Sequence, residues 1–89
     1  MNSAKLSDIM NEVYEETDNA MSANAPMHSL HEGYAVILEE VDEFKAEVWK
    51  NPRKHPDRMV LARKELIQIA AMAIRAIYDV TDKERTDHV

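Results

Sequence analysis

The sequence predicts an all-α protein, and three observations lead to that prediction. Hydrophobic residues make up 45% of the chain, which argues against a disordered protein. The chain has one glycine and three prolines, and no stretch alternates strongly between apolar and polar residues as half-buried strands do. Apolar residues instead recur every three or four positions in three separate segments. We therefore predict an antiparallel bundle of three main helices.

The chain length fits a single domain over residues 1–89. Its last stretch, residues 81–89, is charged, and we expect a frayed tail there. A monomer of this size buries only roughly 60–65% of the surface that its unfolded chain exposes. We therefore expect homo-oligomerisation to complete the bundle, as a dimer or a tetramer, and the sequence does not distinguish these two.

Amphipathic periodicity predicts the first helix from about Ser3 to Ser22. Its apolar positions at helical spacing are Leu6, Ile9, Met10, Val13, Tyr14 and Met21. Residues 23–28 contain Pro26 and have no periodicity. They are predicted to form the first connection.

The second helix is predicted from Leu30 to about Lys50. Ser29 and Glu32 match a capping box, in which the Ser29 side chain accepts from the Glu32 amide and the Glu32 side chain returns to the Ser29 amide. One apolar stripe is expected to comprise Leu30, Tyr34, Ile37, Leu38, Val41, Phe44 and Val48. The carboxylates expected on the other side are Glu39, Glu40, Glu43 and Glu47.

The third helix is predicted after a second connection, residues 51–57, which contains two prolines in a basic stretch. Asp57 is its expected N-cap, and the helix is predicted to continue to about Val80. In its C-terminal half only Gln68 and Arg75 are strongly polar. A helix that is apolar nearly all round is expected to be buried on more than one side.

Charge and composition exclude several classes of function. Seventeen acidic residues against eleven basic ones give a net charge of −6, which disfavours binding to a nucleic-acid backbone. The longest apolar run, residues 69–74, is far too short to span a membrane, and residues 1–10 have no apolar core of a signal peptide. The absence of cysteine excludes disulfides and thiolate metal sites. We expect a soluble cytoplasmic protein.

The acidic residues are the best indication of function. Glu65 is flanked one helical turn either way by Leu61 and Ile69, and burying a carboxylate there is costly unless a cation or a donor compensates it. A divalent cation shared with the Glu39–Glu43 segment would do so, because these side chains can approach one point beside the helix. Oxygen-only ligands select Mg²⁺ or Mn²⁺ over Zn²⁺.

Simpler interpretations remain open for the same residues. The Glu39–Glu43 segment is also what a solvated helix face looks like. Glu65 can be protonated in an apolar setting, or it can pair with Arg63 or Arg75. Neither alternative needs a metal.

The acidic spacing resembles that of a known family. Glu39-Glu40-x-x-Glu43, followed after 21 residues by Glu65-x-x-Gln68, is similar to the E-E-x-x-E and E-x-x-D motifs of the MazG-type all-α nucleoside triphosphate pyrophosphohydrolases. The flanking segments, residues 31–38 and 68–73, resemble the short MazG-like proteins of phages and mobile elements. The resemblance covers residues 28–80.

The resemblance implies a Mg²⁺-dependent hydrolase that converts a deoxy or non-standard nucleoside triphosphate to the monophosphate and pyrophosphate. It also implies that Mn²⁺ can take the place of Mg²⁺. It assigns metal binding to Glu40, Glu43 and Glu65. Gln68 stands where the family usually has Asp, and its amide oxygen can coordinate Mg²⁺ but adds no charge. Glu39, the remaining carboxylate, is the candidate to position or deprotonate the attacking water.

Four further residues are candidates for substrate binding. His31 lies where family members place side chains near the base, and Lys54, Arg58 and Lys64 are cations between the two acidic motifs in sequence. Solubilising a loop is an equally good reason for these cations. The alternative function is a non-catalytic helical dimer that binds a nucleotide or a protein partner. The preferred base and sugar, the number of metal ions and the identity of the general base are not readable from the sequence.

Overall fold

The computed structural model describes residues 3–82, with side chains from residue 5, and that part of the chain is helical with no strand. Its elements in chain order are α1 (Ser3–Ala23), α2 (Leu30–Val48), α3 (Arg58–Ala76) and the short π-helix η1 (Ile77–Thr81). The predicted all-α class is confirmed, and each helix boundary lies within about two residues of its prediction if η1 is taken as the end of the third helix. Residues 83–89 of the expected tail lie outside the described residues. No helix in the described chain has the length and apolar character needed to cross a membrane.

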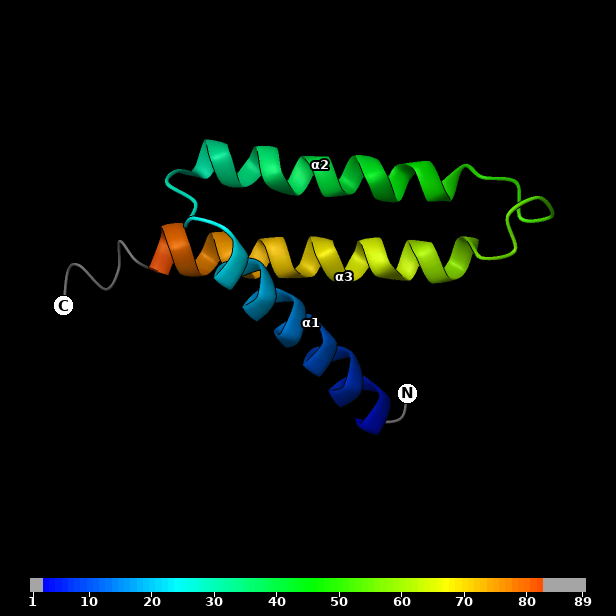
Figure 1. Ribbon diagram of the computed structural model, residues 1–89, viewed down its shortest axis with the longest axis horizontal. Coiled ribbons are helices and arrows are strands. Elements are labelled where there is room, and N and C mark those ends of the chain that lie inside the picture. The colour runs from blue at the N-terminus through cyan, green and yellow to red at the C-terminus, as the bar shows by residue number, and fades with distance from the viewer. Residues whose placement is uncertain (1–2, 83–89) are drawn as a thin grey trace.

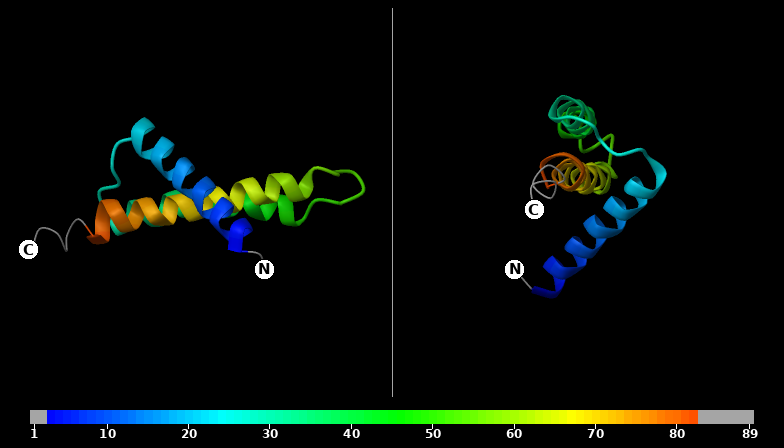
Figure 2. Two further views of the ribbon diagram at one scale, coloured as in Figure 1. Left: turned by 90° about the horizontal axis from the view of Figure 1, so that it is seen from below. Right: turned by 90° about the vertical axis from the view of Figure 1, so that its left-hand side faces the viewer.

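Two of the three helices form an antiparallel pair, and the third crosses it. Figure 1 shows α2 and α3 side by side, joined at one end by the second connection. α1 runs obliquely across α3, and the end-on view in Figure 2 places it on a different side of α3 from α2. The predicted antiparallel bundle is therefore right for α2 and α3, whereas α1 is splayed. α3 packs against both other helices, as its nearly all-apolar C-terminal half predicts.

The start of α2 is capped much as predicted. The Ser29 hydroxyl accepts a hydrogen bond from the Glu32 amide at 3.1 Å. The Glu32 carboxylate, however, accepts from the amide of His28 and not from that of Ser29. The backbone at Ser29 is extended (φ −155°, ψ 163°), and the amide that the carboxylate meets is the preceding one. The capping box is thus only half formed, although both ends of it stabilise the helix start.

Asp57 precedes α3 as predicted, but its side chain makes no capping hydrogen bond. Its backbone (φ −87°, ψ 2°) lacks the extended conformation in which an N-cap side chain reaches back to the first-turn amides. Asp57 is thus the N-cap by position, as predicted, and its carbonyl oxygen accepts from the Leu61 amide, but its side chain does not cap the helix.

The core is small and lies where the first connection meets α3. Its buried apolar residues, among those described, are Met27, Ala71 and Met72. The buried carboxylate of Asp79 accepts a 2.9 Å hydrogen bond from the Met27 amide, which ties the connection to η1. A core with no large side chain wholly out of water stabilises a chain only weakly.

The rotation of α2 differs from the prediction. Most of the expected apolar stripe is exposed, namely Leu30, Tyr34, Leu38, Val41 and Val48. The face that meets α3 carries Gly33, which is buried, and the half-buried Glu40 and Glu47. Glu40 and Glu47 were predicted on the side away from the apolar stripe, and that prediction was wrong for the face that meets α3, because both lie on it. A Cβ at Gly33 would lie 3.3 Å from the Cβ of Ala76, so the missing side chain permits the close approach of the two helices on this face.

We expect Gly33→Leu to lower the free energy of unfolding by about 2 kcal/mol, because the larger side chain would force α2 away from Ala76 and Met27. Gly33→Ala is the matched control. Its gain in helix propensity, about 1 kcal/mol, is offset by the tight contact with Ala76, so we expect little net change. Urea unfolding of the three proteins measures both effects. Equal stability of the Leu and Ala variants would contradict this close packing.

Candidate functional site

Three carboxylates from two helices converge on one point. Glu40 and Glu43 lie one turn apart on α2, and Glu65 faces them from α3. One oxygen from each lies within 4.8 Å of one from each of the others. Glu40 and Glu65 are half-buried between the helices, whereas Glu43 is exposed at the rim. We call these three residues the acidic cluster.

Two members of the acidic cluster, Glu40 and Glu65, have a pKa above that of an isolated carboxyl group. Burial raises the pKa of Glu40 to about 7, and the hydrogen bond and charge of Glu43 and the charges of Glu65 and Glu39 act in the same direction. Burial also raises the pKa of Glu65, and Glu43 adds to this, while the nearby charge of Lys64 opposes it. Three carboxylates this close cannot all ionise without cost unless a cation joins them.

The protein without metal should be more stable in mild acid than in mild base. The folded-state pKa of Glu40 is raised from 4.5 to about 7, so the folded chain binds this proton more tightly than the unfolded chain. The resulting stabilisation is complete below about pH 4.5 and is lost as the pH rises through about 7. Because Glu40 is only half-buried, we expect the free energy of unfolding to fall by on the order of 1 kcal/mol between pH 5 and 8. Denaturant unfolding in chelator, at several pH values, measures it.

Glu40→Gln should remove most of this pH dependence of stability, and at pH 8 the variant should be more stable than the wild-type protein. Glu39→Gln, a change of the same kind at an exposed neighbour, should keep most of it. If the two variants show the same pH dependence as each other, Glu40 does not carry the effect.

The acidic cluster fits a hard divalent cation. All its donors are carboxylate oxygens, which Mg²⁺ and Mn²⁺ prefer. The Oε2 atom of Glu65 is buried without a hydrogen-bond partner among the described residues. Such an atom is costly unless something outside the chain satisfies it.

Neither arginine considered as a partner for Glu65 pairs with it. Arg63 binds the Glu12 carboxylate, and this pair lowers the pKa of Glu12. Arg75 donates instead to the carbonyl oxygen of Ala25. The ion-pair interpretation of Glu65 is therefore wrong, while its protonation in the absence of metal agrees with the raised pKa.

The other two residues of the predicted catalytic set lie at the edges of the acidic cluster. Gln68 lies one turn beyond Glu65 on α3, and its Nε2 donates to Glu16 Oε1 at 2.7 Å. This bond links α3 to α1 and leaves the amide oxygen of Gln68 as the atom that could bind a cation. Glu39 is exposed on α2 next to Glu40, and its charge contributes to the raised pKa of Glu40.

The predicted substrate-binding residues are dispersed. Lys64 is exposed beside the acidic cluster, where its charge acts on Glu65. Arg58 donates to the carbonyl oxygens of Glu47 and Val48 at 2.9 and 2.8 Å, and so satisfies the C-terminal end of α2. His31 and Lys54 are exposed in the first turn of α2 and in the second connection. A role for these residues in substrate binding stays a prediction.

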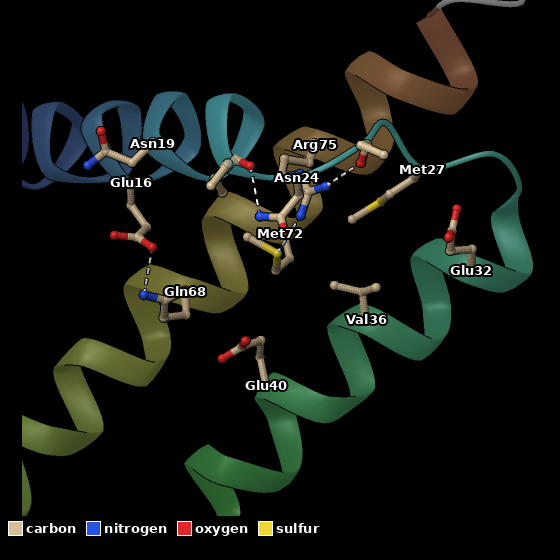
Figure 3. Close-up of a pocket in the computed structure, with 13 residues that line it drawn as sticks. Glu16, Asn19, Asn24, Met27, Glu32, Val36, Glu40, Gln68, Met72 and Arg75 are labelled. Carbon is tan, nitrogen blue, oxygen red and sulfur yellow. Dashed lines mark hydrogen bonds between the residues drawn. The ribbon is translucent and has the colours of Figure 1, made fainter.

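A cavity adjoins the acidic cluster. It has a volume of about 600 Å³, within the range of small-molecule sites, and it lies between α1, the first connection, α2 and α3 (Figure 3). Glu40 lines it, as do Gln68 and Glu16, so the cavity and the acidic cluster share a wall.

Sequence reasoning missed the part that α1 plays in this cavity. Glu16, Asn19 and Asn24 all line it from the C-terminal half of α1 or just after it. The only signal in the sequence was Arg75, a charged residue in an otherwise apolar helical segment, which lines the cavity from α3.

Comparison of the chain with models of protein families, with curated proteins and with solved structures gave no match.

Proposed function

We propose that the chain is a Mg²⁺-dependent nucleoside triphosphate pyrophosphohydrolase, which converts a deoxy or non-standard nucleoside triphosphate to the monophosphate and pyrophosphate. One observation carries the proposal: three carboxylates from two helices meet beside a cavity of about 600 Å³, large enough for a nucleoside. The MazG-like spacing of the acidic motifs supports the same conclusion. The proposal makes the protein a cytoplasmic house-cleaning enzyme, because its substrates are found in the cytoplasm.

In this proposal Glu40, Glu43 and Glu65 hold the cation, and the amide oxygen of Gln68 is an additional ligand. A bound Mg²⁺ supplies positive charge that neutralises the phosphate oxygens and orients a phosphorus centre for in-line attack. Glu39 lies beside Glu40 on the solvent side, where it can accept a proton from the attacking water.

The positive charge that the phosphates need beyond the cation is assigned to Lys64, whose charge already acts on Glu65. Lys54 and Arg58 are proposed as outer contacts to the leaving pyrophosphate, and His31 as a contact to the nucleoside. Of these four residues, Lys64 has the strongest support because it is the only one coupled electrostatically to the acidic cluster.

The proposal includes a second copy of the chain that covers the apolar surface of the first. Large apolar side chains are exposed on every helix of the described chain, among them Met10, Tyr34 and Met59. Contiguous apolar surface of this kind marks a contact with another chain. A groove between α1 and the end of α3 is the best candidate for that contact, and it is lined by Ile9, Met10, Val13, Tyr14, Met21, Ile74 and Tyr78.

Pyrophosphate release from a panel of ribo-, deoxy- and modified nucleoside triphosphates, with Mg²⁺, with Mn²⁺ and with chelator, tests the proposed activity. We expect release that requires the metal and favours a subset of the panel. No release by the folded, oligomeric protein would overturn the proposal and favour a helical dimer that binds a nucleotide or protein partner without catalysis.

A further inference from the structure

Arg75 is a buried cation that has no carboxylate partner among the described residues. Its side chain projects from α3, and the residue is only 6% exposed. Nη2 donates to the carbonyl oxygen of Ala25 at 3.2 Å, Nη1 contacts the sulfur of Met72 at 3.4 Å, and Nε has no partner among the described residues. A guanidinium has five N–H donors, and a thioether sulfur is a weak acceptor. The buried guanidinium group therefore donates to one oxygen acceptor among the described residues.

Leaving a charge and a donor unsatisfied in this way is costly, and native proteins seldom do it without a compensating ligand. The neighbouring carboxylates do not compensate it. Glu16 accepts from Gln68, Glu32 accepts from His28, and the buried carboxylate of Asp79, one turn along from Arg75, accepts from the Met27 amide. Among the described residues, none of the three forms an ion pair with Arg75.

Arg75 and the acidic cluster lie toward opposite ends of the same cavity. Glu40 and Gln68 line one end, and Arg75 and Asn24 line the other, as Figure 3 shows. Gln68 and Arg75 are seven residues apart on one helix, which separates their backbones by about 10 Å. A nucleoside is of comparable length, so its phosphate-bearing end and its base can meet the two ends at once.

The chemistry of the Arg75 end suits a base better than a phosphate. The ionisable side chains that line the cavity besides Arg75 are the carboxylates of Glu16, Glu32 and Glu40, which would repel an anion bound there without a metal. Apolar side chains of Met27, Val36 and Met72 line the space next to Arg75, as a flat base requires.

We infer that Arg75 is a specificity-determining residue, which donates a hydrogen bond to a carbonyl oxygen of the nucleobase. Guanine, thymine, uracil and cytosine carry such an oxygen, and adenine does not. The inference rests on the proposed function, because it takes the acidic cluster as the phosphate end of the cavity. It deepens that function by naming the class of base, which the sequence motifs leave open.

Nucleoside binding in chelator tests Arg75 separately from hydrolysis. We expect thymidine and guanosine to bind the wild-type protein about 10- to 100-fold more tightly than adenosine, as measured by calorimetry or by NMR titration. Arg75→Met, of similar length but without donors, should remove that preference by weakening thymidine and guanosine. Arg53→Met, the same change in the exposed second connection, should leave it intact.

Arg75→Lys guards against misfolding of the methionine variant, because it keeps the positive charge and an ammonium group that donates hydrogen bonds. It should retain part of the preference with unchanged helix content by circular dichroism. The preference of the wild-type protein for thymidine and guanosine over adenosine is measured without any variant, so it does not depend on whether a variant folds.

Equal binding of adenosine and the carbonyl-bearing nucleosides to the wild-type protein, or no binding of any of them, would overturn the role of Arg75. So would a preference that persists in Arg75→Met. These outcomes differ from failure of the proposed function, which is the absence of metal-dependent pyrophosphate release from every triphosphate tested.

Discussion

Replacing Glu43 by Gln is expected to lower kcat/KM for metal-dependent pyrophosphate release by at least about 100-fold. Glu43 is the member of the acidic cluster nearest to solvent, and it interacts with both Glu40 and Glu65. Loss of an outer partner of a metal ligand already costs about 10–100-fold, so loss of a ligand should cost more. Glu65→Gln should have an effect of the same size. Both variants should stay folded, since each relieves repulsion among three carboxylates.

A matched control lies one turn along the same helix. Glu47→Gln makes the same chemical change, but Glu47 pairs with Lys50 at 2.7 Å and is not part of the acidic cluster. It should keep near-normal activity. Titration with Mn²⁺, followed by electron paramagnetic resonance, supplies a second readout. Glu43→Gln should weaken Mn²⁺ binding, whereas Glu47→Gln should not. Loss of activity in both variants to the same degree would mean that the acidic cluster is not the metal site.

Helix positions and the convergence of the acidic motifs were predictable from the sequence, because they depend on local rules. Ser29 begins α2 because its hydroxyl satisfies an orphan amide, and the prolines end α2 before α3 starts. Glu40 and Glu43 are neighbours on any helix that contains them. Their meeting with Glu65 required only that α2 and α3 pair antiparallel, as their short connection favours.

The rotation of α2 was not predictable from periodicity alone. The pattern of apolar residues identified a stripe that includes Tyr34 and Val41, and it placed Glu40 on the other side of the helix. The structure instead turns Gly33 and Glu40 toward α3, because the absent side chain of Gly33 permits close packing against Ala76. This contact depends on Ala76, which is far from Gly33 in the sequence. The periodicity of the α2 segment therefore carries no information about it.

The contribution of α1 to the cavity was missed for a related reason. Its polar residues Glu16 and Asn19 look like the solvated face of an ordinary amphipathic helix. They line the cavity because α1 crosses α3 obliquely, and a crossing angle is set by side-chain packing along the whole contact. Arg75 could have been singled out, since a charge in a segment that is otherwise apolar must find a partner.

The second large effect that we expect is on association between copies of the chain, and it concerns exposed apolar surface. The groove between α1 and the end of α3 is apolar and open, and two of its residues, Met10 and Tyr14, are 62% and 71% exposed. If a second copy covers this groove, Met10→Glu places a charge at the contact twice, once in each subunit of a symmetric dimer. We expect the dissociation constant to rise by about 100-fold or more, which corresponds to about 3 kcal/mol.

Sedimentation equilibrium of the wild-type and Met10→Glu proteins measures this effect, with a monomer mass of 10.2 kDa as the reference. Asn11→Glu is the control, because it adds the same charge at an exposed residue of α1 that does not line the groove. Since the core of one chain is so small, dissociation should also lower stability, and the unfolding temperature of the wild type should rise with protein concentration. A wild-type protein that is monomeric at all concentrations, or equal association of both variants, would rule out this groove as the subunit contact.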